Sequence, residues 1–279
     1  NFRKNHSLYA QLDKKWGRLN LSLGSRYEYF SINSEKDHIV NSDTINHIHA
    51  AKPVFRTGLN YQLAKATYIR SSWGQGYRFP SMAELFIVAN QSGMEIYPNP
   101  ELKPESGWSS EIGIKQGVKF KNWKGYIDVA AFLMRYNDMM EFTFGAWGDP
   151  ETKPLFGLGF KSVNVGKTQI SGIEFSLSGE GNINKNLTIS VLAGYTYMNP
   201  ISLDLNAAYA TAYDGVTEIT YATSSSDTTM LKYRYKHISK IDLEIAYKKI
   251  SFGGSLRYND FMQNIDKIFT EDLINNGIP

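Results

Sequence analysis

Histidine is the side chain best suited to bind metals or move protons near neutral pH, and three of the five histidines cluster. His38, His47 and His49 fall within the polar stretch 31–53. The His47-x-His49 spacing is a candidate for metal ligation, and solvated loop histidines are the alternative. The chain has no cysteine, which excludes disulfides and thiolate ligands. We predict no bound metal and no cofactor.

A second chemistry-bearing stretch is GYRFPSMAELF, residues 76–86. Ser81 and Glu84 are spaced as a capping box, in which each side chain binds the backbone amide of the other residue. The apolar run Leu85–Ala89 then predicts a short helix. Arg78 is the one fixed cation of this stretch and faces either a ligand or the interior. A loop held by one helical turn is the alternative to a ligand clamp.

Enzyme signatures are missing elsewhere in the sequence. We find no Ser-His-Asp pattern, no P-loop and no complete GxGxxG, because GQGYRF stops after two glycines. Glu95, Glu101 and Glu105 lie in a loop without a visible paired geometry. The net charge of +3 is small and evenly spread, which gives no indication of nucleic-acid binding. We therefore predict that the protein is not an enzyme.

The elements that position these residues read as β-strands. RLNLSLGSRYEYF, residues 18–30, shows the period of a strand with one buried or lipid-facing side. The apolar residues stand at odd positions, Leu19, Leu21, Leu23, Tyr27 and Tyr29, and the polar ones at even positions, Arg18, Asn20, Ser22, Arg26 and Glu28. The alternation recurs along the chain and predicts about ten strands. They cover residues 6–16, 18–30, 54–63, 66–75, 106–117, 124–142, 160–181, 187–198, 235–248 and 250–262.

The connections between these strands alternate between short and long. Short turns are expected at Gly17, Ala64–Lys65, 118–123, Asn182–Asn186 and Lys249, and long loops at 31–53, 76–105, 143–159 and 199–234. This asymmetry is typical of outer-membrane barrels, which have short periplasmic turns and long extracellular loops. No stretch approaches the roughly 18 apolar residues of a membrane-spanning helix. The fold class predicted is an all-β, antiparallel transmembrane β-barrel.

Ten strands do not complete such a barrel. An open sheet edge in lipid would leave backbone groups unpaired, each at a cost of several kcal/mol. We therefore expect residues 1–279 to form one partial barrel domain that strands outside this sequence complete. The first residues, NFRKNHSLY, and the last, LINNGIP, are interpreted as cuts within a longer protein.

Six aromatic side chains of the long loops are candidate ligand contacts. Their rings could stack on a catechol, a porphyrin or a sugar face, and packing within the loops or at the membrane interface is the alternative. They are Tyr97, Trp147, Phe156, Tyr209, Tyr213 and Tyr221.

Two carboxylates are predicted to point into the barrel lumen. Glu111 and Glu174 each alternate with apolar residues that face lipid. Those apolar residues are Trp108, Ile112 and Ile114 on strand 106–117, and Ile173, Phe175 and Leu177 on strand 160–181. A carboxylate removed from water needs a partner, whereas a water-filled lumen would solvate it.

Several motifs, in this order and spacing, resemble the C-terminal half of the barrel of TonB-dependent outer-membrane receptors. The resemblance covers essentially the whole chain. The motifs are Tyr77-Arg78-x-Pro80 with Glu84-Leu85-Phe86, Asn99-Pro100-x-Leu102-Lys103-Pro104-Glu105, Glu111-x-Gly113-x-Lys115, and Gly172-Ile173-Glu174.

This resemblance implies a 22-stranded barrel closed by an N-terminal plug domain. It also implies that ligands bind at the extracellular loops and the plug apex, and that the TonB complex pulls on the plug using the proton-motive force. Neither the plug nor a TonB-binding segment is in this sequence, and roughly three closing strands would follow Pro279. Glutamates at the positions of Glu111 and Glu174 pair with plug arginines in the family, and Arg78 is expected to face the plug or the ligand.

The predicted function is import of a scarce nutrient across the outer membrane of a Gram-negative bacterium. The expected partners are the TonB complex, a small extracellular ligand and membrane lipid. An iron chelate such as a siderophore is the expected cargo, because iron chelates are the commonest substrates of the family. Some haem importers carry a histidine between the first two motifs, but 81–98 contains none. The alternatives are glycan or cobalamin cargo, a passive porin-like channel or barrel enzyme, and a soluble adhesin or lectin-like sheet protein.

Overall fold

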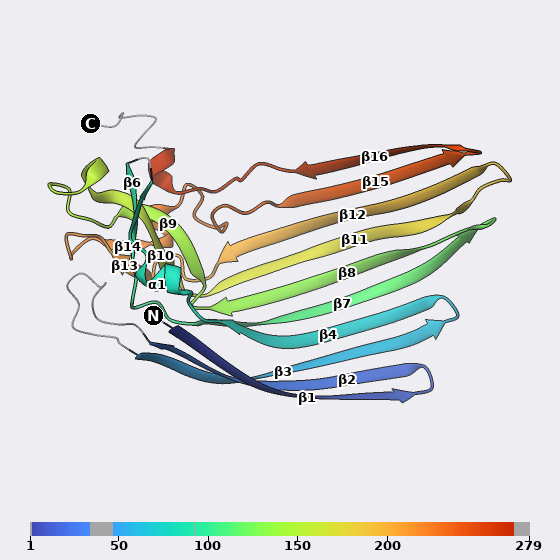
Figure 1. Cartoon of the computed structure of the whole chain (residues 1–279), viewed down its shortest axis with the longest axis horizontal. Coiled ribbons are helices and arrows are strands. Elements are labelled where there is room, and N and C mark those ends of the chain that lie inside the picture. Colours follow the sequence, from blue (N-terminus) through green and yellow to red (C-terminus); the bar gives the residue numbers. More distant parts are fainter. Residues whose placement is uncertain (1, 34–46, 92, 271–279) are drawn as a thin grey trace.

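The computed structural model describes residues 2–33, 47–91 and 93–270. Its main element is one antiparallel sheet of ten strands, in the order β1-β2-β3-β4-β7-β8-β11-β12-β15-β16 (Figure 1). The strands are β1 (Phe2–Trp16), β2 (Leu19–Asn33), β3 (His47–Ala64), β4 (Thr67–Arg78), β7 (Glu105–Phe120), β8 (Trp123–Asn137), β11 (Thr168–Asn182), β12 (Leu187–Ser202), β15 (His237–Tyr247) and β16 (Ile250–Asn259). The predicted antiparallel sheet of about ten strands is confirmed.

The other elements belong to the long connections. Two smaller sheets contain β5 (Ala89–Gln91), β6 (Met94–Tyr97), β9 (Met140–Ala146) and β10 (Leu158–Asn164), and β13 (Ala208–Thr211) with β14 (Glu218–Thr220). The short helices are α1 (Met82–Phe86), α2 (Tyr221–Ser224), η2 (Pro154–Gly157) and η3 (Lys267–Phe269). None of the helices in the described residues is long and apolar enough to cross a membrane.

The strand pairing gives the large sheet one apolar and one polar face. Ile112 on β7 lies beside Ala131 of β8, which lies beside Ile173 of β11, so one face carries a continuous apolar row. These side chains have little cover: Ile112 is 60% exposed and Ile173 is 52% exposed. Glu111 and Glu174 alternate with them on the opposite, polar face. The period-two prediction for both strands is confirmed.

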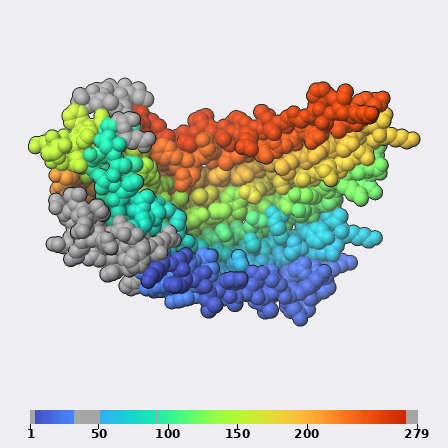
Figure 2. Space-filling model, in the orientation of Figure 1, coloured from blue at the N-terminus to red at the C-terminus, as the bar shows by residue number. Residues whose placement is uncertain are grey.

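The two ends of the sheet differ as the connection lengths predict. The turns β1–β2, β3–β4, β7–β8, β11–β12 and β15–β16 all lie at the same end, at the right of Figure 1. Gly17 takes a positive φ of 56° in the first of them, a conformation that glycine adopts without steric cost. The long connections gather at the other end and form a thick body there (Figure 2). We call this body the loop cap, residues 79–91, 93–104, 138–167, 203–236 and 260–270.

Two of the predicted strands are each divided in the structure. The run 124–142 breaks at Asp138, where φ is 51°, and 160–181 breaks at Gly166, where φ is 87°. Backbone hydrogen bonds from Met139 to Gly166 and from Val165 to Met139 hold the breaks side by side. The outer pieces, β9 and β10, pair with each other in the loop cap. The expectation of continuous strands there is wrong. Apolar and polar residues alternate on both sides of each break, so the sequence pattern does not reveal that the chain changes direction.

The loop cap has two hydrophobic clusters of its own. One joins Phe30 of β2 and Phe79 to Leu85 of α1, Leu102 and Met140. The other is built from Met139, Trp147, Val163, Val165, Tyr221 and Leu231. Connections expected to be simple loops therefore fold as a packed unit.

Candidate functional site: the polar wall and the loop cap

The polar face of the sheet holds a network of three charges around Arg70 on β4. The Nε atom of Arg70 donates to Glu111 Oε1 at 2.9 Å, and a terminal nitrogen donates to Asp128 on β8. The three side chains are 32%, 33% and 14% exposed. Glu111 thus already has a cationic partner within the ten-stranded sheet, which we call the wall.

Gly113 makes room for this network. A Cβ atom at this position would lie 2.9 Å from Arg70 Cζ and 3.0 Å from the carbonyl oxygen of Val129. The guanidinium of Arg70 therefore lies across the bare backbone of β7. In the motif Glu111-x-Gly113 the glycine provides the space in which the cation reaches the glutamate.

Glu174 on β11 stands in a different environment. It is exposed, its neighbours across the strands are Ala130 and Thr196, and no hydrogen bond or ion pair reaches it among the described residues. β7 and β11 are separated only by β8, where Glu111 lies opposite Phe132 and Glu174 opposite Ala130. With this offset of two residues, the two glutamates lie roughly 12 Å apart at the usual strand spacing. One is held in the wall and the other is available for a partner.

Arg78 connects three parts of the molecule at the mouth of the sheet. It forms ion pairs with Glu84 of α1 at 2.7 Å and with Glu105 at the start of β7 at 3.2 Å. Glu105 also accepts a hydrogen bond from the backbone N–H of Met140 on β9. The predicted capping box between Ser81 and Glu84 is confirmed, with both reciprocal hydrogen bonds present.

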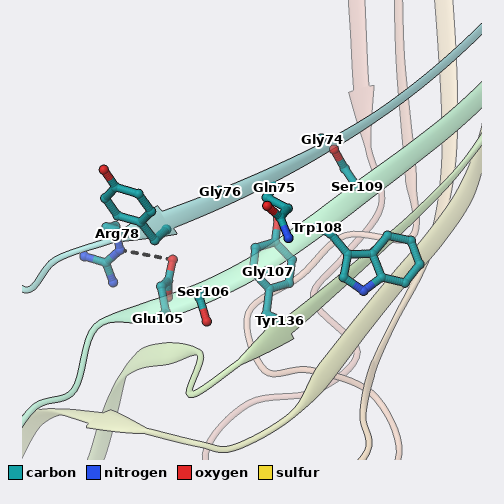
Figure 3. Close-up of a pocket in the computed structure, with 11 residues that line it drawn as sticks. Gly74, Gln75, Gly76, Arg78, Glu105, Ser106, Gly107, Trp108, Ser109 and Tyr136 are labelled. Carbon is teal, nitrogen blue, oxygen red and sulfur yellow. Dashed lines mark hydrogen bonds and ion pairs between the residues drawn. The ribbon is translucent and has the colours of Figure 1, made fainter. Parts of the chain in front are cut away.

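A small cavity follows β4 and β7 next to this ion pair. Its volume is about 270 Å³. Figure 3 shows Arg78 and Glu105 at one end of the cavity. Gly74, Gly76 and Gly107 line it farther along the two strands, and these positions have no side chain to fill the space. The volume is below the range of about 300–1,000 Å³ usual for small-molecule sites. We therefore do not assign the cargo to this cavity.

A larger cavity of about 500 Å³ lies in the loop cap. Within the described residues, no ion pair joins any two of its charged side chains. These side chains are Glu101, Lys103, Asp138, Lys161 and Asp204. Lys161 on β10 extends over the ring of Trp147, with Nζ 5.3 Å from the ring centroid. Burial lowers the pKa of Lys161, and the nearby Glu101 opposes this shift.

The six aromatic candidates divide by exposure. Tyr221 is completely buried and Trp147 is 8% exposed. Tyr97 and Tyr209 pack against the same hydrophobic cluster. Four of the six thus contribute to the packing of the loop cap. Phe156 and Tyr213, 52% and 54% exposed, have rings that a ligand could reach directly.

The structure does not describe the side chains of the three candidate histidines. His38 lies outside the described residues. His47 and His49 belong to β3 by their backbone, and their side chains are not among those described. No group of three or more potential metal-ligating side chains occurs in the part of the chain that the structure describes.

A buried ion pair in the loop cap was not predicted from the sequence. Lys232 Nζ lies 2.6 Å from Asp266 Oδ1, and both side chains are 1% exposed. Lys232 also donates to Thr143 Oγ1 at 2.8 Å, while Asp266 accepts from the hydroxyl of Tyr233 at 2.7 Å and from the N–H of Phe144 at 3.0 Å. No local pattern marks either charge, because 34 residues separate them.

Comparisons with known proteins agree with this architecture. The family model "TonB dependent receptor-like, beta-barrel" matches residues 1–272. A curated relative, hemoglobin and hemoglobin-haptoglobin-binding protein A of Haemophilus influenzae, is 23% identical over 238 residues, which is 73% of this chain and 22% of the relative. The chain thus spans about a fifth of the length of that relative.

Solved structures with the same fold include two receptors. The hemophore receptor HasR of Serratia marcescens, in complex with its hemophore HasA and heme, superposes with a TM-score of 0.62 at 17% identity, over 95% of this chain and 45% of that one. The ferric-catecholate import receptor Fiu of E. coli K12 gives a TM-score of 0.56 at 19% identity, over 93% of this chain and 34% of that one. At these identities the likeness establishes the fold alone.

The family match also interprets the two faces of the large sheet. In transmembrane barrels the apolar face contacts lipid and the polar face lines the lumen, so the face with Ile112 and Ile173 corresponds to the lipid-facing side of the family's barrel. The matched family is one of receptors of the Gram-negative outer membrane, and no enzyme family is indicated. The chain belongs to the TonB-dependent receptors and forms part of their β-barrel.

Proposed function

We propose that this chain is part of a receptor that imports an iron chelate across the outer membrane of a Gram-negative bacterium, driven by the TonB complex. The observation that carries the proposal is the arrangement of the ten-stranded wall. Its outer face is apolar, its inner face is charged, and a packed cap stands at one end. Such a wall surrounds a polar passage through a membrane.

The loop cap is the proposed place of first contact with the cargo. Its 500 Å³ cavity has the size of a small-ligand site. Lys161, whose ammonium pairs with no carboxylate of the described residues, and Tyr209 line this cavity and supply a positive charge and an aromatic ring. The exposed rings of Phe156 and Tyr213 lie elsewhere in the loop cap and add aromatic surface there. Ferric chelates of the siderophore class present oxygen anions and, in the catecholates, flat aromatic rings, and these groups suit such side chains.

Growth on defined iron sources tests this proposal. A strain that lacks the full-length gene is expected to lose growth when a ferric siderophore is the only iron source, and to grow normally on excess iron salts. Inactivating TonB in a strain with the intact gene is expected to have the same effect. Uptake that continues without TonB would instead indicate a passive, porin-like channel.

Haem iron is the second candidate cargo. The curated relatives that match this chain are named for haemoglobin and haemoglobin–haptoglobin binding or utilisation. Growth of the deletion strain on haemoglobin as the sole iron source separates the two candidates. Loss on haemoglobin alone would assign haem, and normal growth on every iron source would direct attention to glycan or cobalamin cargo.

We further propose that the polar face docks an N-terminal plug domain and that Glu174 is the main carboxylate of this contact. Glu111 already shares Arg70 with Asp128. A plug arginine would therefore have to compete with Arg70 for the carboxylate of Glu111. Glu174 has no partner among the described residues, and a plug arginine would meet an open carboxylate. Arg78, held by two glutamates, would position the mouth of the barrel.

A further inference from the structure

One acidic side chain in the loop cap has no role in the proposed transport path. Glu141 lies on β9 and is 8% exposed. Its Oε1 atom is buried and has no hydrogen-bond partner among the described residues, and its Oε2 atom is 3.5 Å from the hydroxyl of Tyr221. A buried carboxylate with so few donors is costly in its ionised form.

The neighbouring buried ion pair does not supply the missing positive charge. Lys232 is neutralised by Asp266 at 2.6 Å, and its ammonium also donates to Thr143 and to Ser224. With this pair alone, an ionised Glu141 would make two negative charges for one positive charge. Arg234, a second cation nearby, is half-buried and forms no ion pair with Glu141 among the described residues. The free energy of the closed cap therefore favours Glu141 in its neutral, protonated form.

The titratable groups near Glu141 come from several segments packed on β9. They are Lys232, Tyr233 and Arg234 before β15, Asp266 before η3, Tyr221 of α2 and Tyr209 of β13. The paired strand β10 adds Lys161, which lies opposite Thr143 and so on the same face as Glu141. Arg234 is the second cation of this set. Its guanidinium donates to the carbonyl oxygens of Lys232 and Tyr233, and within the described residues it forms no ion pair with Glu141.

The segments that meet here are far apart in the chain. The cluster joins β9 to the stretch 221–234 and to the stretch 264–269, through the Lys232–Asp266 pair and the hydrogen bond from the N–H of Phe144 to Asp266. An uncompensated charge on Glu141 therefore acts on three segments at once. The carboxylate of Glu141 becomes hydrated again when these contacts open.

We propose that the loop cap is a proton-controlled unit in which protonated Glu141 keeps the three segments closed and ionised Glu141 loosens them. The inference goes beyond the proposed function, since it holds for any cargo. A receptor of this design would hold a tight cap in acidic surroundings and a looser one in alkaline surroundings.

The direction of the pH effect follows from the shift of one group. Burial raises the pKa of Glu141 to about 7, and the charges of Lys232 and Arg234 oppose the shift. An acid whose pKa is raised in the closed state binds more protons there than in the open state. It stabilises the closed state fully below its ordinary pKa, and this stabilisation is lost as the pH rises toward and through about 7.

Amide hydrogen exchange in the full-length receptor, purified in detergent, tests the proposal. Peptides covering 140–146, 221–234 and 264–269 are compared at about pH 5.5 and about pH 8, with exchange times scaled for the intrinsic rates. In the wild type we expect cap opening to increase on the order of tenfold at the higher pH. In Glu141→Gln, which mimics the protonated acid, we expect full protection at both pH values.

Two comparisons make the result specific to Glu141. Glu151→Gln, at an exposed position of the same cap, is expected to retain the pH dependence of the wild type. Peptides of β11 are expected to stay protected throughout. Equal wild-type protection at both pH values would overturn the proposal, as would a Glu141→Gln variant that keeps the pH dependence or is open at both. None of these outcomes depends on growth, so the transport proposal stands or falls separately.

Discussion

The wall and the loop cap each contain an ion-pair cluster, and the two differ in access to water. In the wall, Arg70, Glu111 and Asp128 are 32%, 33% and 14% exposed. In the loop cap, Lys232 and Asp266 are each 1% exposed and are enclosed by hydrogen-bond partners. The same kind of charge pairing is therefore partly exposed to water in the wall and buried in the loop cap.

The difference in exposure gives the two clusters different roles. Water and salt screen the wall charges, so each pair contributes little stability, and a partner that brings its own charge can exchange with them. In the cap, both ions have left water and the desolvation cost is met only while both are present. The wall cluster suits docking and release, whereas the cap cluster holds three distant segments together.

Breaking the cap pair is expected to have the largest effect. Asp266→Leu leaves Lys232 buried without its counter-charge, which typically costs about 3–5 kcal/mol. Hydrogen exchange of the cap peptides measures the loss. The double variant Lys232→Met with Asp266→Leu should recover only part of it. It removes the unpaired charge, but the hydroxyls of Thr143 and Tyr233 and the N–H of Phe144 lose Asp266 as their acceptor. Lys153→Gln, which removes the more exposed pair with Glu95, is the control and should cost about 1 kcal/mol or less.

Filling the space under Arg70 is the next largest change. Gly113→Val places side-chain atoms where the Arg70 guanidinium and the Val129 carbonyl lie, and we expect a loss of about 1–3 kcal/mol in the free energy of unfolding. Chemical denaturation in detergent measures it. Gly254→Val on β16 is the matched control, because a Cβ there meets no atom within 4 Å. Equal losses in both variants would show that the close approach at Gly113 has no special weight.

Arg78 gives a smaller effect of the same kind. Arg78→Lys keeps the charge but loses the planar group that reaches Glu84 and Glu105 together. We expect a loss of about 1 kcal/mol, seen as faster exchange of the α1 amides. Arg257→Lys, at an exposed position of β16, should leave exchange unchanged. Wild-type protection of α1 in the Arg78→Lys variant would mean that the capping box alone holds the helix.

The two wall glutamates should change stability least and docking most. Glu111→Gln and Glu174→Gln are each expected to alter the free energy of unfolding by about 0.5 kcal/mol or less, as is usual for exposed charges. Glu174→Lys, in the full-length receptor, should unseat the plug more than Glu111→Lys does. Entry of a bulky antibiotic through the outer membrane measures the difference. Equal seating in both variants and the wild type would contradict a pairing of either carboxylate with the plug.

The main features of the wall could be predicted from the sequence, because they depend on residues close together in the chain. Alternation along β7 and β11 places Glu111 and Glu174 opposite the lipid-facing isoleucines, and each short turn lies between two adjacent strands. The capping box of Ser81 and Glu84 spans only four residues. The partner of Glu111 escaped prediction, since Arg70 lies 41 residues earlier in the chain and its reach depends on the empty space above Gly113.

The loop cap shows where such local information stops. Backbone turns at Asp138 and Gly166 divide two long alternating runs, and β9 and β10 leave the wall to form another sheet. Tyr221 and Trp147, which have the residue type of ligand contacts, are buried in the cap. Aromatic side chains serve packing and binding equally well, so their type does not decide between the two.

The sequence by itself determined an antiparallel sheet with one lipid-facing and one polar side, short turns at one end, long connections at the other, and the family. These follow from a period of two residues and from spacings within single strands and turns. Only the tertiary structure decided which charges meet, which aromatics are buried and that Glu141 is enclosed beside Lys232 and Asp266. Those properties depend on segments far apart in the chain, and desolvation acts on the assembled set rather than on any residue alone.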